Sequence, residues 1–262
     1  MPAQLELTRL SVRQFAERFK SEMIPLSNTF SYFCASVPMT DDDLKEYLQE
    51  PVAALPAAVT AALPKISILL VPYLERANGG HGPKGRSKTP ASDFVTAEKP
   101  PEGKISTSTQ LRLGDETVLA FALKDQEVAE YHYRFYHLLA TLMGDHWSDD
   151  MESTYGRVLR EELNADAHGE VDEPSWRLKQ TLRRVQTSRG GAVKNSKTFR
   201  GYARQSFIDT LTLYLHGICC DIDVDTGPRQ LPSRYLRKRL MALEQLFPPP
   251  AGYAVFPEQL EP

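Results

Sequence analysis

Two pairs of residues in the second half of the chain combine a carboxylate with an imidazole at helical spacing. Glu130 and His137 are seven residues apart in one predicted helix, and Asp209 and His216 are seven residues apart in another. Seven residues make about two turns of an α-helix, so each pair lies on one helix face. If the two faces meet, the four side chains form a site of the kind that binds a metal ion or performs general acid–base catalysis.

This arrangement predicts a metal-dependent hydrolase as one of two alternatives, and its catalytic residues are Glu130, His137, Asp209 and His216. The His-Glu-x-x-His motif of zinc peptidases, which aims two imidazoles at one metal, does not occur in the sequence. On the first helix His132 and His137 are five residues apart instead of four. The helix also fits a simpler interpretation, in which local ion pairs and hydrogen bonds satisfy a polar edge beside an aromatic stripe.

A short acidic run near the C-terminal end resembles the opening of an EF-hand calcium loop. Asp221, Asp223 and Asp225 occupy the first, third and fifth positions of such a loop. The resemblance then fails, because glycine comes at the seventh position instead of the sixth and Pro232 replaces the glutamate of the twelfth. We therefore predict a weak divalent-metal site at these three aspartates and no certain cofactor.

The uneven distribution of charge along the chain is the feature of the sequence least expected by chance. Residues 1–173 carry 17 Lys and Arg against 27 Asp and Glu, whereas residues 174–262 carry 14 against 7. This asymmetry predicts an acidic half over 1–170 and a basic helical half over 171–262, unless the two form one continuous domain. The basic segment, which contains no acidic residue, consists of Arg177, Lys179, Arg183, Arg184, Arg189, Lys194, Lys197, Arg200 and Arg204.

Such a segment binds phosphate backbones, an acidic partner protein or the acidic half of its own chain. The last predicted helix adds Arg234, Arg237, Lys238 and Arg239 to the basic half. Aromatic residues that could stack on nucleic-acid bases are few within the segment. Our leading prediction is a cytoplasmic binding protein that engages a nucleic acid or an acidic protein through this basic surface and has no chemistry of its own.

The elements that position these residues follow from apolar periodicity and breaker residues. A first helix is expected near 10–23, and Thr40 with three following aspartates marks the start of a second helix. Branched residues predict a buried strand over 66–74, and a hairpin is expected from strands at 105–113 and 117–124, with a further short strand at 94–97. Helices follow over 126–143, 149–163, 174–188, 198–217 and 232–247.

The fold class is therefore α+β, with a small, mainly antiparallel sheet of three to four strands over about 66–124 between N-terminal helices and a C-terminal helical half. We expect the helix with Glu130 and His137 to pack on the strand 117–124.

Composition limits the remaining alternatives. The chain has 262 residues, of which 41% are hydrophobic, which suits a globular protein with a substantial core. No apolar run approaches the roughly 20 residues of a membrane-spanning helix, and the first 20 residues lack the apolar stretch of a signal peptide. Cys34 and the adjacent Cys219 and Cys220 are expected to be reduced and structural, so we predict a cytoplasmic protein without a membrane partner.

Overall fold

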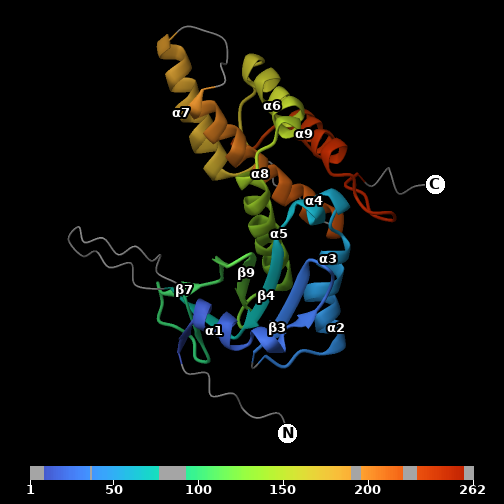
Figure 1. Cartoon of the computed structure of the whole chain (residues 1–262). Coiled ribbons are helices and arrows are strands. Elements are labelled where there is room, and N and C mark those ends of the chain that lie inside the picture. The colour runs from blue at the N-terminus through green and yellow to red at the C-terminus, as the bar shows by residue number, and fades with distance from the viewer. Residues whose placement is uncertain (1–8, 36, 77–92, 190–195, 221–228, 257–262) are drawn as a thin grey trace. The chain divides into compact units, whose positions relative to one another are not determined.

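The computed structural model describes residues 9–35, 37–76, 93–189, 196–220 and 229–256 (Figure 1). The chain divides into two compact units, and each unit combines segments that are not contiguous in sequence. The sheet unit comprises residues 1–49 and 64–134, and the helical unit comprises residues 50–63 and 135–262. The fold is α+β, which confirms the predicted class. The change of charge near residue 170 lies inside the helical unit.

A five-stranded mixed sheet forms the centre of the sheet unit. Its order is β2 (Ile24–Pro25), β3 (Phe30–Cys34), β4 (Lys65–Val71), β9 (Glu116–Ala122) and β8 (Ser108–Leu113). The predicted hairpin of β8 and β9 is confirmed as an antiparallel pair. The central pairs β3 with β4 and β4 with β9 are parallel, however, because each is joined by a long connection instead of a tight turn. The N-terminal strands β2 and β3 were not predicted.

A smaller antiparallel sheet has the order β1 (Leu10–Ser11), β6 (Phe94–Thr96), β5 (Tyr73–Glu75) and β7 (Ile105–Ser106). The single strand predicted over 66–74 is therefore two strands, β4 and β5, in two different sheets. Pro72 separates them, and a proline has no amide hydrogen with which to continue the ladder of β4.

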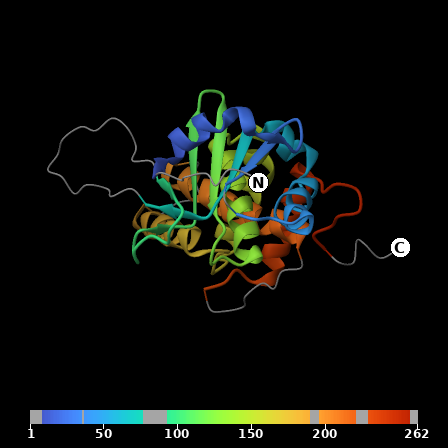
Figure 2. The same cartoon turned by 90° about the horizontal axis from the view of Figure 1, so that it is seen from below.

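Helix α1 (Val12–Arg18) covers one face of the larger sheet, as the blue helix in Figure 2 shows. Its buried Phe15 joins a core cluster with Phe33 of β3, Leu69 of β4 and Val118 of β9. Ser11 caps the helix by accepting a hydrogen bond from the Gln14 amide. A short 3-10 turn, η1 (Lys20–Glu22), follows.

The second predicted helix begins where the sequence indicates. The Thr40 hydroxyl accepts a hydrogen bond from the Asp43 amide, and the Asp43 carboxylate accepts one from the Thr40 amide at 2.7 Å. The helical path then runs through α2 (Asp41–Leu44), a π-helical turn η2 (Lys45–Gln49) and α3 (Glu50–Ala53). Thus one continuous helical stretch carries the chain out of the sheet unit.

Helix α5 (Val128–Asp145) begins in the sheet unit and continues in the helical unit. It carries both Glu130 and His137, as predicted. Its first turns contact β9, because the buried Tyr131 ring lies edge-on to Phe121 with centroids 4.9 Å apart. The aromatic stripe of this segment therefore serves the core.

The helical unit contains the rest of α5 together with α3, α4 (Ala57–Ala62), α6 (Asp149–Asn164), α7 (Glu173–Arg189), α8 (Lys197–Cys219) and α9 (Ser233–Leu246). Helix α8 is central, since α6, α7 and α9 all contact it and its side chains from Phe199 to Ile218 are largely buried. Within the described part of the chain, none of the helices combines the length and the hydropathy needed to cross a membrane.

A network of ionised side chains lies in the interior of the helical unit. Arg239 of α9 is completely buried and forms ion pairs with Glu162 at 2.6 Å and Glu170 at 2.7 Å. Lys179 of α7, also buried, pairs with Glu170 at 3.0 Å. Arg239 is therefore no part of a basic surface, because its guanidinium is enclosed by carboxylates that balance its charge.

Candidate functional site

The predicted basic segment, spread over α7 and α8, is largely engaged with acidic residues of its own unit. Arg177 pairs with Glu173 at 2.7 Å, and Arg204 pairs with Asp145. These contacts use exposed side chains, so they leave both guanidinium groups partly accessible to solvent.

Two further members of the segment are held more firmly. Lys179 donates a hydrogen bond to the Gly169 carbonyl at 2.8 Å in addition to its buried ion pair. Arg183 pairs with Asp166 at 2.9 Å and donates to the Ala167 carbonyl at 2.8 Å. These residues therefore tie α7 to the acidic connection that precedes it, and Lys179 cannot contribute to any surface.

Three other described members of the basic segment have exposed side chains, namely Arg184, Lys197 and Arg200. Lys194 and the side chain of Arg189 lie outside the described residues. By composition, the sheet unit has 15 Lys and Arg against 16 Asp and Glu, and the helical unit has 16 against 18. The charge asymmetry along the sequence is therefore nearly cancelled within each unit.

The four residues of the predicted hydrolase site have separate partners. Glu130 belongs to the sheet unit and forms an exposed ion pair with Arg134 at 2.9 Å. The buried Asp209 carboxylate accepts hydrogen bonds from the Ser175 amide at 3.2 Å and from Gln205 at 2.8 Å. Burial raises the pKa of Asp209, and these hydrogen bonds oppose the rise. Asp209 thus caps the first turn of α7.

The two histidines of the predicted hydrolase site contact different neighbours. His137 Nδ1 lies 3.4 Å from the Thr212 hydroxyl, and the His216 ring lies 5.9 Å from the ring of Tyr136. Over the described ranges, no three of Glu130, His137, Asp209 and His216 place their ligand atoms within 4.8 Å of one another. The metal-dependent hydrolase stays a prediction, as does the divalent-metal site at Asp221, Asp223 and Asp225, which lies outside the described residues.

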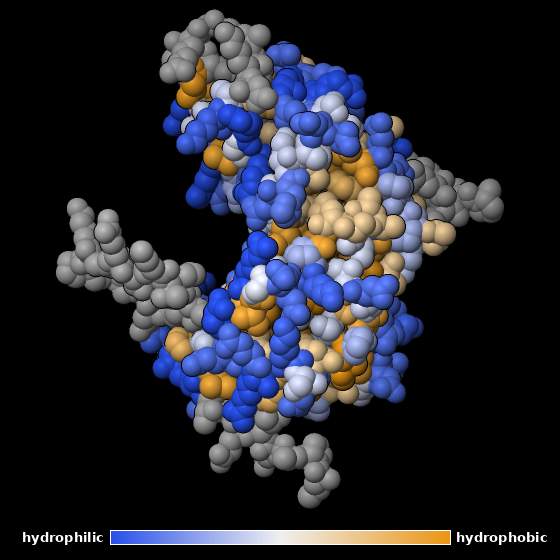
Figure 3. Space-filling view, in the orientation of Figure 1, coloured by the Kyte–Doolittle hydropathy of each residue, from blue (hydrophilic) through white to orange (hydrophobic). Residues whose placement is uncertain are grey.

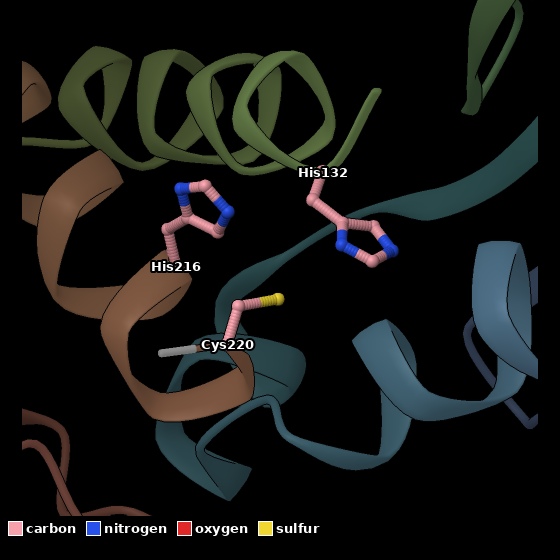
Figure 4. A group of neighbouring side chains, drawn as sticks. All are labelled: His132, His216 and Cys220. Atoms are coloured by element: carbon pink, nitrogen blue, oxygen red, sulfur yellow. The ribbon is translucent and has the colours of Figure 1, made fainter. Parts of the chain in front are cut away.

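A cluster of thiols and an imidazole at the C-terminal end of α8 was not singled out from the sequence. Figure 4 shows His216 and Cys220 on successive turns, and one imidazole nitrogen lies within 4.8 Å of the Cys220 sulfur. Cys219 lies between them in sequence, and its sulfur is hydrogen bonded to Cys220. The signal in the sequence is the four-residue spacing of His216 and Cys220, which puts these two side chains on one helix face.

Hydrogen bonds make the Cys219 thiol unusually acidic. The contact with Cys220 has the largest effect and the hydroxyl of Tyr136 adds to it, so that the pKa of Cys219 is lowered to about 7 although burial opposes the change. A thiolate is the form that binds metals and attacks electrophiles. By contrast, burial raises the pKa of Cys34, in the sheet unit, to about 11.

His132, also drawn in Figure 4, comes from the first turns of α5 in the sheet unit. Its side chain is buried, and its Nε2 lies 2.9 Å from the carbonyl of Glu46 in the same unit. This imidazole therefore has a structural contact within the sheet unit.

The outer face of α9 is the second notable surface of the helical unit. Arg234, Arg237, Lys238 and Met241 follow one another at helical spacing and are all exposed, and we call these four residues the α9 face. Met241, at 53%, is the most exposed of the large hydrophobic side chains in the described part. In contrast to the exposed Met241, the surface over α6 and α7 in Figure 3 is mainly hydrophilic.

Both arginines of the α9 face stack on aromatic rings. The Arg234 guanidinium lies 4.7 Å from the centroid of Tyr235, and that of Arg237 lies 4.4 Å from the centroid of Phe256. Cation–π contacts of this kind restrict the side chains. The guanidinium groups are therefore oriented before any partner binds.

No protein-family model, no curated protein and no solved structure matches this chain.

Proposed function

We propose that the protein is a binding protein whose α9 face docks onto an acidic, partly apolar segment of a partner protein. The observation that carries the proposal is the combination of three exposed basic residues with the exposed Met241 on one helix face. A reducing compartment such as the cytoplasm suits this function, because the three cysteines, all in the described part of the chain, form no disulfide.

The chemistry of the α9 face supports a protein as the partner. Arginine and methionine are enriched in protein interfaces, and Arg234 and Arg237 are held in place by the rings of Tyr235 and Phe256. Carboxylates of the partner would accept hydrogen bonds from the two guanidinium groups and from Lys238. An apolar side chain of the partner would cover Met241.

A nucleic acid is supported less well. Four of the nine residues in the predicted basic segment are ion-paired inside the helical unit, and that unit has 16 basic against 18 acidic residues. Phosphate binding depends on many uncompensated basic groups, since each contact releases a counterion. An exposed methionine adds nothing to that mechanism.

The test is a titration of the full chain with labelled probes, followed by fluorescence anisotropy. The first probe is a helical peptide with leucines at every third and fourth position and glutamates elsewhere, and the second has serine in place of leucine. We expect the leucine peptide to bind more tightly. Met241→Ser should weaken that peptide about tenfold, consistent with partial burial of one apolar side chain, and leave the serine peptide unchanged.

Charge reversal tests the basic half of the α9 face. The double variant R234E/K238E should weaken both peptides at least about tenfold, as expected for lost charge complementarity. Arg157→Glu is the matched control, because Arg157 is exposed on α6 of the same unit but outside the α9 face. Duplex DNA serves as the competing probe: DNA binding that R234E/K238E abolishes, in the absence of peptide binding, would replace the proposal with a nucleic-acid function.

A further inference from the structure

We propose that a hollow at the beginning of strands β3 and β4 binds a small oxyanion, namely a phosphate or carboxylate group carried by a molecule of a few carbon atoms. The hollow has a volume of about 210 Å³, and all the residues that line it belong to the sheet unit. The α9 face belongs to the helical unit, so this inference is independent of the proposed partner binding.

The register of the larger sheet puts four polar side chains of the hollow on one face. Ser31 of β3 is paired with Ser67 of β4, and Lys65 of β4 is paired with Glu116 of β9. Because side chains of a strand alternate between the two faces, these four residues share a face, and all of them line the hollow. Leu69, two residues after Ser67, belongs to the core cluster formed with α1. The hollow therefore continues the face on which α1 packs, with polar residues in place of apolar ones.

Ser67 is the most buried polar side chain of the hollow. It interrupts the apolar run from Ile66 to Val71, and only 6% of it is exposed. Its Oγ lies 3.4 Å from the Oγ of Ser31, which is longer than an ordinary hydrogen bond between hydroxyl groups. A ligand oxygen beside both hydroxyls would accept a hydrogen bond from each, since a hydroxyl hydrogen rotates to suit its acceptor. The serine pair thus suits a ligand that is rich in acceptors.

The charged groups at the hollow favour an anion. Glu116 is already paired with Lys20 of η1 at 3.4 Å, which balances its charge. Lys65 has no ion-pair partner among the described residues, and its side chain is exposed. One positive charge therefore stays uncompensated beside the two serine hydroxyls. Hydrogen bonds from an ammonium group to a phosphate or carboxylate are about twice as strong as those between neutral groups.

The size of the hollow limits the rest of the ligand. Pockets for drug-sized molecules have volumes of about 300–1,000 Å³, so the hollow admits a smaller molecule. Asn28 and Thr29, which precede β3, also line it. Their carboxamide and hydroxyl groups can each donate and accept hydrogen bonds, which suits hydroxyl groups on the carbon chain of the ligand.

The experiment is isothermal titration calorimetry of the full chain with three probes that share a carbon chain, at constant ionic strength and in a buffer free of phosphate and carboxylate. The probes are glycerol phosphate, glycerate and uncharged glycerol. At least one of the two anions should bind at one molecule per chain, and glycerol should not bind. The anion that binds more tightly identifies the group as phosphate or carboxylate. Added sodium chloride should weaken the binding, because salt screens the attraction to Lys65.

Variants of the hollow test the assigned residues. Lys65→Gln and the double variant S31A/S67A should each weaken the anion at least about tenfold, as expected for lost hydrogen bonds to a charged group. Lys99→Gln and Ser108→Ala are the matched controls and should leave the affinity unchanged, since both residues belong to the sheet unit but do not line the hollow.

Circular dichroism of each variant separates loss of binding from loss of folding. Should S31A/S67A not fold, Lys65→Gln decides the test, because its side chain is exposed. The proposal is overturned if neither anion binds wild-type protein, if glycerol binds as tightly as the anions, or if folded variants of the hollow retain wild-type affinity.

Discussion

The guanidinium of Arg239 and the carboxylate of Glu162 form a two-pronged ion pair that is completely enclosed by protein. Arg239 Nη2 lies 2.6 Å from Glu162 Oε2, and Nε lies 3.0 Å from Oε1. The remaining donors of Arg239 reach Glu170, Ser206 and the hydroxyl of Tyr202. This network links α6, α8 and α9 through one side chain.

We expect Arg239→Met to lower the free energy of unfolding by about 3–5 kcal/mol, because it leaves Glu162 and Glu170 buried with fewer positive partners. Urea denaturation of the full chain measures the change. Lys238→Met, one residue earlier and exposed, should change the stability by at most about 0.5 kcal/mol. Equal stability of the two variants would show that the buried network does not hold the helices together.

The acid sensitivity of the helical unit should depend on Glu170. Burial by itself would raise the pKa of Glu170, but Arg239, Lys179 and the Tyr202 hydroxyl outweigh it and lower the pKa from 4.5 to about 2. Folding thus favours the ionised carboxylate. The stabilisation is complete above the unfolded-state pKa and is lost as the pH falls from about 4.5 through about 2.

Unfolding free energies measured between those two pH values test this assignment. Glu170→Gln should be less stable than wild type at neutral pH and should show a flatter loss of stability in acid. Glu173→Gln, at an exposed residue on α7, should follow the wild-type curve. An identical acid slope for Glu170→Gln and wild type would contradict the assignment.

Gly169 should tolerate no side chain. Its φ is +74°, and a Cβ there would lie 2.1 Å from the backbone oxygen of Gln230, which belongs to the bridge between Glu170 and Gln230. Gly169→Ala should therefore cost several kcal/mol, well above the about 1–2 kcal/mol of left-handed backbone strain alone.

Gly252→Ala provides the strain-only comparison, because Gly252 has a φ of +86° and a Cβ there would have no neighbour within 4 Å. Thermal denaturation of both variants separates the two contributions. A Gly169→Ala variant no less stable than Gly252→Ala would show that the contact to Gln230 is not retained in solution.

Charge reversal should divide the basic segment into two classes. Arg183→Glu should lower the stability by about 1 kcal/mol or more, because Arg183 holds Asp166 and the Ala167 carbonyl. Lys197→Glu and Arg200→Glu, at exposed positions, should stay within about 0.5 kcal/mol of wild type. If wild-type protein binds duplex DNA at low salt and all three variants lose that binding without loss of stability, the segment is a nucleic-acid surface instead.

Local features of the fold could be predicted from the sequence. The hairpin of β8 and β9 follows from its turn at Gly114, whose φ is +63°, and the start of α2 follows from the Thr40 cap. The long helices follow from their apolar stripes. Each of these signals needs only residues that are neighbours along the chain.

Features that depend on distant partners could not be predicted. The parallel pairing of β3 with β4 joins segments more than thirty residues apart, and nothing within 30–34 specifies it. Likewise, the sequence alone predicts that Arg239 and Lys179 lie at the surface. Only the structure shows that they pair with Glu162 and Glu170 in the interior. The proximity of His216 to Cys220 was not predicted, because His216 was assigned to the hydrolase site with Glu130, His137 and Asp209.

The division of the chain into interrupted units affects the order in which the protein can fold during synthesis. Residues 50–63 are synthesised between the two segments of the sheet unit. Their buried Leu55 and Val59 nevertheless belong to the helical unit, and the rest of that unit begins only at residue 135. Synthesis proceeds at about 5–20 residues per second, so this apolar segment waits several seconds for its partners. Leu55 and Val59 therefore stay exposed, and prone to aggregation, from their own synthesis until the later segments of the helical unit have been made.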